Sequence, residues 1–165
     1  MSRSKNAPSG TPALVALAAA GVPHTAHAYE HDPRSTVGYG LEAAEVLGID
    51  PEQVYKTLMA SVDGTRTVAV VPVAGKLDLK ALAHAVGGKK AVMADPAAAE
   101  RATGYVVGGI SPLGQKTPHP TVVDETVQLF DTVFVSGGRR GLDVELAPDD
   151  LIRLTSATVA DIARG

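Results

Sequence analysis

The sequence contains no cysteine and no tryptophan, and only 4% of its 165 residues are aromatic. The absence of cysteine excludes disulfides, protein thiolate nucleophiles and cysteine-ligated metals, so folding needs no oxidising compartment. Because aromatic rings are scarce, we expect the core to be built from aliphatic side chains and alanine. Any chemistry that the protein performs must therefore come from other groups.

Long apolar runs and a strong excess of one charge are also missing. The net charge of −3 argues against binding nucleic acid by bulk electrostatics alone, although it leaves room for a local basic patch. No apolar run is long enough to span a bilayer. The short run at residues 14–20 lacks the strongly cationic start and the cleavage site of a signal peptide. We expect a cytoplasmic protein with no membrane partner.

The common signatures of cofactor and metal binding are absent. Gly75-Lys76 lacks the upstream glycine spacing of a P-loop, and neither G-x-G-x-x-G after a strand nor G-x-S-x-G occurs. Glu30, His31 and Asp32 are adjacent polar residues, but they lack the i, i+4 spacing that would make a metal site specific. We therefore expect no cofactor and no metal.

Short helical and strand-like segments alternate along the chain. Residues 1–10 are polar and predict a flexible tail, and residues 11–165 are of the size of one domain. Thr11-Pro12 combines an N-cap with a first-turn proline, and Asp63-Gly64 between two apolar runs predicts a hairpin. The predicted helices cover residues 13–20, 38–47, 78–86, 97–102 and 148–155, and the predicted strands cover 24–30, 54–62, 67–73, 90–93, 105–107, 121–123, 129–136, 142–146 and 158–160.

The order of these segments bounds the fold class. Strands and helices mix without a regular βαβ repeat, and no internal repeat or low-complexity linker is present. We therefore predict a single compact, mixed α/β domain. Its central sheet should be mixed, partly antiparallel and barrel-like, and helices should surround it.

The most informative stretch is residues 104–115, with the sequence GYVVGGISPLGQ. An apolar run breaks at Gly108-Gly109 and stops at Pro112, so backbone amides can approach a ligand closely and the exit direction is fixed. Such a backbone corner can bind an oxyanion or a phosphate without a catalytic side chain. The alternative is a plain hairpin or bulge, but the pattern is longer than a turn requires.

Lys56 lies on the apolar face of the predicted strand 54–62, because side chains alternate between the two faces of a strand. Its side chain either snorkels past the sheet edge or directs the ammonium group into a partly closed cavity. In the second case Lys56 would anchor a phosphate or carboxyl oxygen, or donate to a carbonyl.

A second polar cluster surrounds the predicted turn at residues 137–141. Ser136, Arg139, Arg140 and Asp143 form either a solvated polar face or a rim that meets a polar ligand, with the arginines on phosphates. These residues taken alone favour the solvated face.

Five blocks of the sequence, in the same order, resemble the YbaK/EbsC family, which is related to the editing domain of prolyl-tRNA synthetase. The blocks are VYKTL at 54–58, VPV at 71–73 with LDLK at 77–80, MADP at 93–96, GYVVGGISPLGQK at 104–116 and VSGGRRGLD at 135–143. The resemblance covers about residues 13–164. It implies a compact α/β editing domain that removes cysteine wrongly attached to tRNA(Pro), acting beside prolyl-tRNA synthetase.

The resemblance also implies roles for individual residues. Lys56 is then the key pocket lysine, and the backbone of Gly108, Gly109 and Ile110 lies against the aminoacyl ester; we assign these four residues to catalysis. The expected substrate-binding residues are Tyr29, Thr57, Ser111, Pro112, Ser136, Arg139 and Asp143. No evident protein nucleophile is present, which suggests that the thiol of the cysteinyl ester attacks its own carbonyl, although attack by water stays open.

Several functions remain compatible with the sequence. We expect a trans-editing deacylase that clears Cys-tRNA(Pro), with Cys-tRNA(Cys) as a second substrate. The alternatives are a deacylase for another small amino acid such as alanine, a non-catalytic module that binds a nucleotide or tRNA end, and an interaction domain in which the glycines only form turns. The sequence indicates no oligomeric state.

Overall fold

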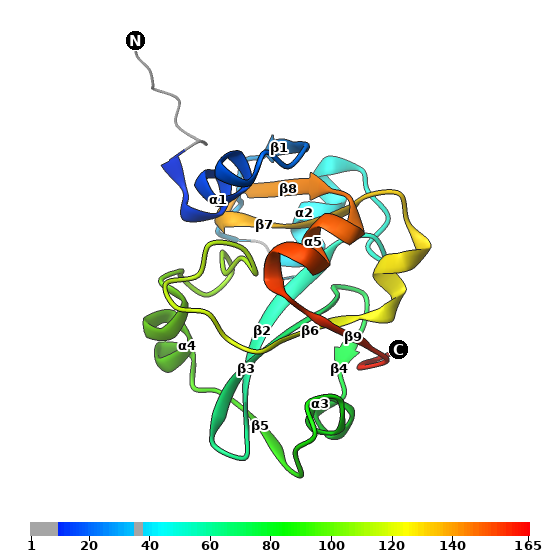
Figure 1. Ribbon diagram of the computed structural model, residues 1–165. Helices are drawn as coiled ribbons and strands as arrows, with labels where there is room; N and C mark the ends of the chain where they lie inside the picture. The colour runs from blue at the N-terminus through cyan, green and yellow to red at the C-terminus, as the bar shows by residue number, and fades with distance from the viewer. Residues whose placement is uncertain (1–9, 35–37) are drawn as a thin grey trace.

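The computed structural model describes residues 10–34 and 38–165 (Figure 1). Apart from Gly10, the predicted tail lies outside the described residues. The helices are α1 Pro12–Ala20, α2 Tyr39–Leu47, α3 Leu79–Ala85, α4 Pro96–Thr103 and α5 Pro148–Thr155, with a 3₁₀ helix η2 at Glu125–Leu129. The strands are β1 His24–Ala28, β2 Tyr55–Val62, β3 Thr65–Pro72, β4 Lys76–Leu77, β5 Ala91–Met93, β6 Thr121–Asp124, β7 Val133–Arg139, β8 Leu142–Leu146, β9 Thr158–Ala160 and β10 Ala163–Arg164.

The local signals in the sequence act as predicted. The Thr11 hydroxyl accepts a hydrogen bond from the Leu14 amide at 3.2 Å and caps α1, with Pro12 in the first turn. Asp63 and Gly64 both have positive φ, of 50° and 88°, which is the backbone of the two-residue hairpin turn between β2 and β3. All five predicted helices are confirmed, and every predicted boundary lies within one residue of the observed one.

The strands form a five-stranded sheet, a three-stranded sheet and a short two-stranded sheet. The five-stranded sheet has the order β5-β2-β3-β6-β9, in which β2 pairs antiparallel with both neighbours while β6 pairs parallel with β3 and β9. The order β1-β8-β7 forms the antiparallel three-stranded sheet. The mixed α/β class is confirmed. Within the described residues the barrel-like centre is a set of packed sheets and not one closed barrel.

The start of β2 joins the two larger sheets. An isolated parallel bridge links Val54 to Phe134 of β7, and the Phe134 amide donates to the Gln53 carbonyl at 3.1 Å. Figure 1 shows β7 and β8 lying across the upper end of the long β2–β3 hairpin. Beyond this bridge, the same edge of β2 has no pairing strand in the described structure until β5 pairs with residues 60–62.

The core is aliphatic, as the composition predicts. A main cluster includes Leu17, Val70 and Val135, and a second cluster beneath α3 includes Leu82 and Ile162. β2 contributes to both clusters because successive side chains point to opposite faces of a strand, so Met59 packs in the first cluster and Ala60 in the second.

One buried carboxylate attaches the end of the chain to this core. Asp124 Oδ1 accepts hydrogen bonds from the amides of Ile162 and Ala163 at 2.9 and 3.0 Å, which holds the C-terminal segment against β6. The buried carboxylate thus meets the donors it needs.

Two strand predictions differ from the structure by more than two residues at a boundary or altogether. Residues 105–107 form bends and a turn, because Gly104 and Gly108 both have positive φ and Tyr105 turns its hydroxyl inward to the Leu113 carbonyl at 2.6 Å. The strand predicted at 129–136 begins at Val133 and runs to Arg139 through a bulge, because residues 125–129 form η2.

The sequence did not predict the short strand pair β4–β10, because two residues per strand leave no pattern to detect. Among the described helices, none has the length and apolarity required to cross a membrane.

Candidate functional site

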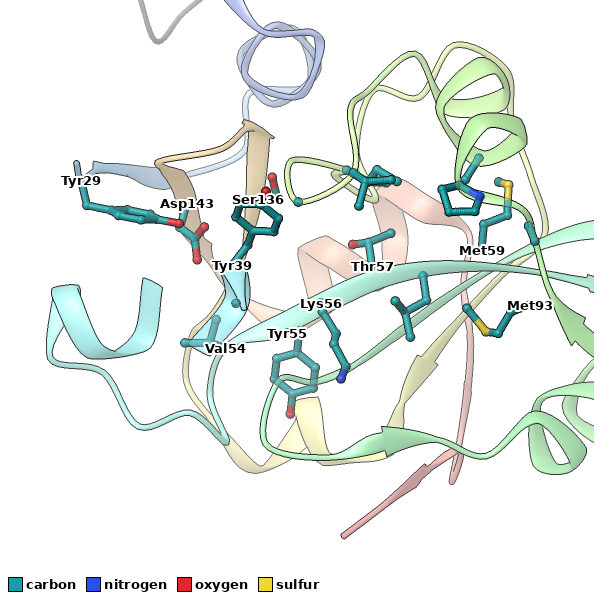
Figure 2. Close-up of a pocket in the computed structure, with 18 residues that line it drawn as sticks. Tyr29, Tyr39, Val54, Tyr55, Lys56, Thr57, Met59, Met93, Ser136 and Asp143 are labelled. Carbon is teal, nitrogen blue, oxygen red and sulfur yellow. The ribbon is translucent and has the colours of Figure 1, made fainter. Parts of the chain in front are cut away.

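A cavity of about 320 Å³ lies where β2, the glycine corner and the β7–β8 hairpin meet (Figure 2). This volume is in the range of small-ligand sites. Seven of the eleven predicted site residues line it: Tyr29, Lys56, Thr57, Gly108, Ile110, Ser136 and Asp143. The tertiary structure therefore brings together residues that are up to 114 positions apart in the chain (143 − 29).

The cavity occupies a gap along one edge of β2. On this edge the Gln53 carbonyl accepts from β7, and the Met59 carbonyl accepts from the Ala94 amide at 3.0 Å, just beyond β5. β5 pairs with β2 only opposite residues 60–62. Because backbone groups of alternate residues point to the same edge of a strand, the amide and carbonyl of Thr57 face the gap. The cavity thus has backbone hydrogen-bonding groups in its floor.

Lys56 and Thr57 leave this edge on opposite faces of β2 (Figure 2). Lys56 is half-buried, and its Nζ donates to the Gly75 carbonyl at 2.9 Å. Burial lowers the pKa of the Lys56 ammonium, and the nearby Lys76 lowers it further. An ammonium has three donors, so Lys56 keeps capacity to donate to a ligand oxygen beyond its bond to Gly75.

Thr57 presents a buried hydroxyl to the cavity. Its Oγ1 is the one buried side-chain polar atom without a hydrogen-bond partner among residues 10–34 and 38–165. An unpaired buried hydroxyl carries a desolvation cost of about 1–3 kcal/mol. A ligand that supplies the missing partner would recover that cost, so Thr57 is suited to contact a bound polar group.

The glycine corner forms the wall opposite β2. Gly108 has a φ of +89°, and a Cβ at this position would overlap the ring of Tyr39. The Gly109 amide donates to the Val106 carbonyl at 2.8 Å and so closes the turn. The amides of Gly108 and Ile110 have no acceptor within the described part of the chain. These two amides, and not that of Gly109, are the donors that the corner can offer to an oxyanion.

Four predicted residues lie outside the cavity lining: Gly109, Ser111, Pro112 and Arg139. Gly109 packs on the backbone of the β7–β8 hairpin, where an added Cβ would lie 2.8 Å from the Cα of Arg139. Ser111 is buried, and its hydroxyl accepts from the Leu113 amide at 3.2 Å. Pro112 is buried beside it. Their positions support the corner from behind.

Tyr39 is a wall residue that sequence reasoning missed. It was interpreted only as the start of a helix, and one aromatic at a helix N-terminus carries no further signal. The Arg140 guanidinium stacks over its ring at 4.7 Å, and Arg140 Nε donates to the Val107 carbonyl at 2.9 Å. Arg140 therefore ties the first turn of α2 to the glycine corner. The remaining lining residues are mostly apolar and include Met59, Met93, Pro96 and Ala99.

Among the described residues, Asp143 is the only one that brings a carboxylate to the cavity lining. It lies in the middle of β8 between His27 and Ser136 of the neighbouring strands, and it is only 6% exposed. No group of the described chain donates a hydrogen bond to its carboxylate. Burial raises the pKa of Asp143 to about 7, against a smaller opposing effect of His27. Burial, followed by the nearby Asp143 charge, raises the pKa of Tyr29 to about 12.

We predict that Asp143→Asn changes the pH dependence of stability. The unfolded carboxyl releases its proton near pH 3.8, whereas the folded one holds it until about pH 7. In this interval the folded state binds more protons, so the free energy of unfolding of the wild type falls as pH rises. At about 1.4 kcal/mol per pKa unit, a rise from 3.8 to about 7 corresponds to a loss on the order of 4 kcal/mol.

Urea unfolding at pH 4 and pH 8 measures this effect. The Asp143→Asn variant should gain stability relative to the wild type at pH 8 but not at pH 4. Asp149→Asn, which removes an exposed carboxylate of α5, should retain the wild-type dependence. A parallel pH dependence in Asp143→Asn and the wild type would contradict the assignment.

The site has the chemistry of a pocket for a polar ligand. No group of three or more metal-ligating side chains occurs in the described residues. What converges instead is an ammonium, a free hydroxyl, two backbone amides and a buried carboxylate around an apolar space. With its fold, this arrangement defines a small α/β protein whose cavity is suited to a polar ligand held against main-chain donors.

Comparison with known proteins places the chain in a family. Residues 36–154 match the model of the aminoacyl-tRNA editing domain, and the chain belongs to that family. A solved structure described as that of a provisionally assigned trans-editing enzyme for prolyl-tRNA synthetase superposes with a TM-score of 0.82 at 27% identity, covering 98% of this chain and all of the other.

Several curated relatives are similar over most of the chain. A protein from Enterococcus faecalis, provisionally named the Cys-tRNA(Pro)/Cys-tRNA(Cys) deacylase EbsC, is 43% identical over 122 residues, or 72% of this chain and 73% of its own. The multifunctional Ser/Thr-tRNA deacylase ProXp-y of Escherichia coli is 27% identical over 78% of this chain and 80% of its own. A proline–tRNA ligase of Geobacter metallireducens matches 73% of this chain, at 32% identity, with only 21% of its own length.

Proposed function

We propose that the protein is a trans-editing deacylase that hydrolyses or otherwise releases cysteine from Cys-tRNA(Pro), with Cys-tRNA(Cys) as a second substrate. The observation that carries this proposal is the cavity along the free edge of β2, where ammonium, hydroxyl and amide donors meet and no cysteine or histidine is among the described lining residues. Membership of the aminoacyl-tRNA editing family supports it, and so does the similarity to the E. faecalis protein.

In the proposed mechanism the substrate supplies the nucleophile. The cysteinyl sulfur attacks its own ester carbonyl, a C–S bond forms, the C–O bond to the ribose breaks, and the thiol proton ends on the ribose oxygen. A well-oriented intramolecular attack can lower a barrier by up to ~7–11 kcal/mol. The amides of Gly108 and Ile110 would hold the developing oxyanion, and Lys56 would orient an oxygen of the terminal adenosine or the carbonyl.

The surface charge suits a protein that receives its substrate from a partner. A net charge of −3 gives little non-specific attraction for tRNA. We therefore propose that prolyl-tRNA synthetase is the partner that binds the misacylated tRNA and presents it to this protein. Addition of the synthetase should then lower the KM for Cys-tRNA(Pro) without changing kcat.

We predict strong discrimination between cysteine and serine esters. Serine is nearly isosteric but lacks the thiol, so Cys-tRNA(Pro) should be deacylated at least about 100-fold faster than Ser-tRNA(Pro), because most of the benefit of intramolecular attack is lost. The measurement is single-turnover deacylation of Cys-tRNA(Pro), Ser-tRNA(Pro), Ala-tRNA(Pro) and Cys-tRNA(Cys).

The outcomes of this assay separate the proposals. Equal rates for cysteine and serine esters would contradict attack by the substrate thiol while leaving the deacylase intact. Preference for Ala-tRNA(Pro) would assign a different amino acid to the pocket. Binding of the tRNA end without turnover of any ester would contradict the enzymatic function itself.

A further inference from the structure

The cavity has two chemically different ends. Figure 2 shows Tyr29, Asp143 and Ser136 at one end, Met59 and Met93 at the other, and Lys56 and Thr57 between them. The first end is polar and contains a buried carboxylate, whereas the second is apolar. An elongated ligand with one cationic end would therefore bind in a single direction.

Building on the proposed function, we propose that the aminoacyl end of the tRNA binds with its α-ammonium group against Asp143. The RNA chain then leaves across Met93 and Ala94 into a groove that contains Arg66 and His119. Asp143 becomes the subsite for the amino acid, and the groove becomes a subsite for the phosphodiester backbone before the terminal adenosine.

The ammonium subsite is argued from the state of Asp143. Asp143 is only 6% exposed, and its carboxylate receives no hydrogen bond from residues 10–34 or 38–165, so a ligand that provides a cationic partner would offset the cost of burying it. The two nearby basic side chains contact other groups. His27 Nε2 on the neighbouring strand lies 3.0 Å from Glu145 Oε1, and Lys56 Nζ donates to the Gly75 carbonyl. The α-ammonium is the one cation of an aminoacyl-adenosine ester, so it is the complementary group.

The exit path is argued from a second, independent hollow. A groove of about 760 Å³ shares Met93 and Ala94 with the cavity and so continues from its apolar end. Its walls come from the β2–β3 hairpin, from the start of α4 and from residues 118–120. The apolar end of the cavity is then the place for the adenine base, and the groove is the place for the nucleotides that precede it.

The groove offers donors suited to phosphate oxygens. Arg66 is exposed and forms no ion pair in the described part of the chain, and the hydroxyls of Ser61 and Thr65 lie in the same wall. The one acidic residue of the groove, Asp95, accepts the Ala98 amide at 3.3 Å as the cap of α4. His119 Nδ1 contacts Gln115, and burial, followed by the charge of Arg66, lowers the His119 pKa.

The ammonium subsite is tested by pairing a variant with a modified substrate. Wild-type protein and Asp143→Asn are assayed with Cys-tRNA(Pro) and with its N-acetyl derivative, which has no ammonium. The wild type should prefer the free amine by about tenfold or more, as for a charge-assisted contact, and Asp143→Asn should lose this preference. If Asp143→Asn loses activity equally on both substrates, the preference for the free amine is unchanged and the subsite is overturned.

The groove is tested by the length of the RNA. Arg66→Ala should lower the ratio of kcat/KM for Cys-tRNA(Pro) to that for a cysteinyl-adenosine ester by about fivefold, since only the longer substrate reaches the groove. Arg153→Ala, which removes an exposed arginine of α5, should leave the ratio unchanged. An unchanged ratio in Arg66→Ala would overturn the exit path. If the wild type cleaves neither ester, the proposed function fails; if it cleaves both, only the binding direction is at stake.

Discussion

Gly108→Ala is expected to lower deacylation of Cys-tRNA(Pro) by about a hundredfold, because a displacement of about 1 Å at a reacting centre has an effect of this size. The added Cβ would overlap the ring of Tyr39, over which the Arg140 guanidinium stacks at 4.7 Å from the ring centroid. Either Tyr39 moves into the cavity or the corner moves away from β2. In both cases the amides of Gly108 and Ile110 no longer face the ester in the same geometry.

The cost of a left-handed backbone must be separated from this effect. Alanine at positive φ costs about 1–2 kcal/mol wherever it occurs. Gly48→Ala is the matched control, since Gly48 has a φ of +69° at the end of α2 and no atom within 4 Å of an added Cβ. In thermal unfolding Gly48→Ala should show only the backbone cost, and Gly108→Ala should lose at least as much because its Cβ also meets Tyr39. Only Gly108→Ala should lose activity. Full activity in Gly108→Ala would show that the corner takes no part in the reaction.

Lys56→Met should reduce kcat/KM for Cys-tRNA(Pro) by about 10²–10³-fold, the effect of removing one donor to a developing oxyanion. Methionine retains the apolar stem of the side chain, so the packing along β2 is preserved. The bond from Nζ to the Gly75 carbonyl is lost, which should cost only about 1 kcal/mol in the free energy of unfolding.

Lys76→Met provides the control for this substitution. Lys76 lies on β4 close enough to lower the Lys56 pKa, but it does not line the cavity. It should retain wild-type activity, as measured by the same deacylation assay. If Lys56→Met keeps full activity and loses several kcal/mol of stability, Lys56 serves to anchor the loop at Gly75 and the proposed pocket chemistry is wrong.

Local structure was the part of the fold most accessible from the sequence. Thr11-Pro12 and Asp95-Pro96 start helices because a side-chain oxygen accepts the amide that a helix leaves free, and this depends on three or four adjacent residues. The Asp63-Gly64 turn is equally local, since it needs only two residues that tolerate positive φ. Where a segment lacked such a signal, as in the two-residue strands β4 and β10, it was missed.

The residues of the site also divide into those that the sequence made recognisable and those that it did not. Lys56, Thr57 and the corner at 108–110 were recognisable from motifs, because backbone approach and a lysine on an apolar face leave marks in the sequence. Tyr39 and Met93 could not be found, since their roles come from the elements that pack beside them. Gly109 was placed against the ester, but the structure uses its amide in the turn and its small size against Arg139.

The sequence by itself determined the aliphatic core, the helix ends, the main hairpin and the kinds of group available for chemistry, because composition and short-range hydrogen bonding decide these. Only the tertiary structure decided that the edge of β2 stays open between β7 and β5, and that the Asp143 carboxylate lines this opening with no hydrogen-bond donor from the described residues. Both features depend on how strands distant in the chain pair and stop pairing. Such long-range pairing follows from the packing of the whole domain and not from any single segment.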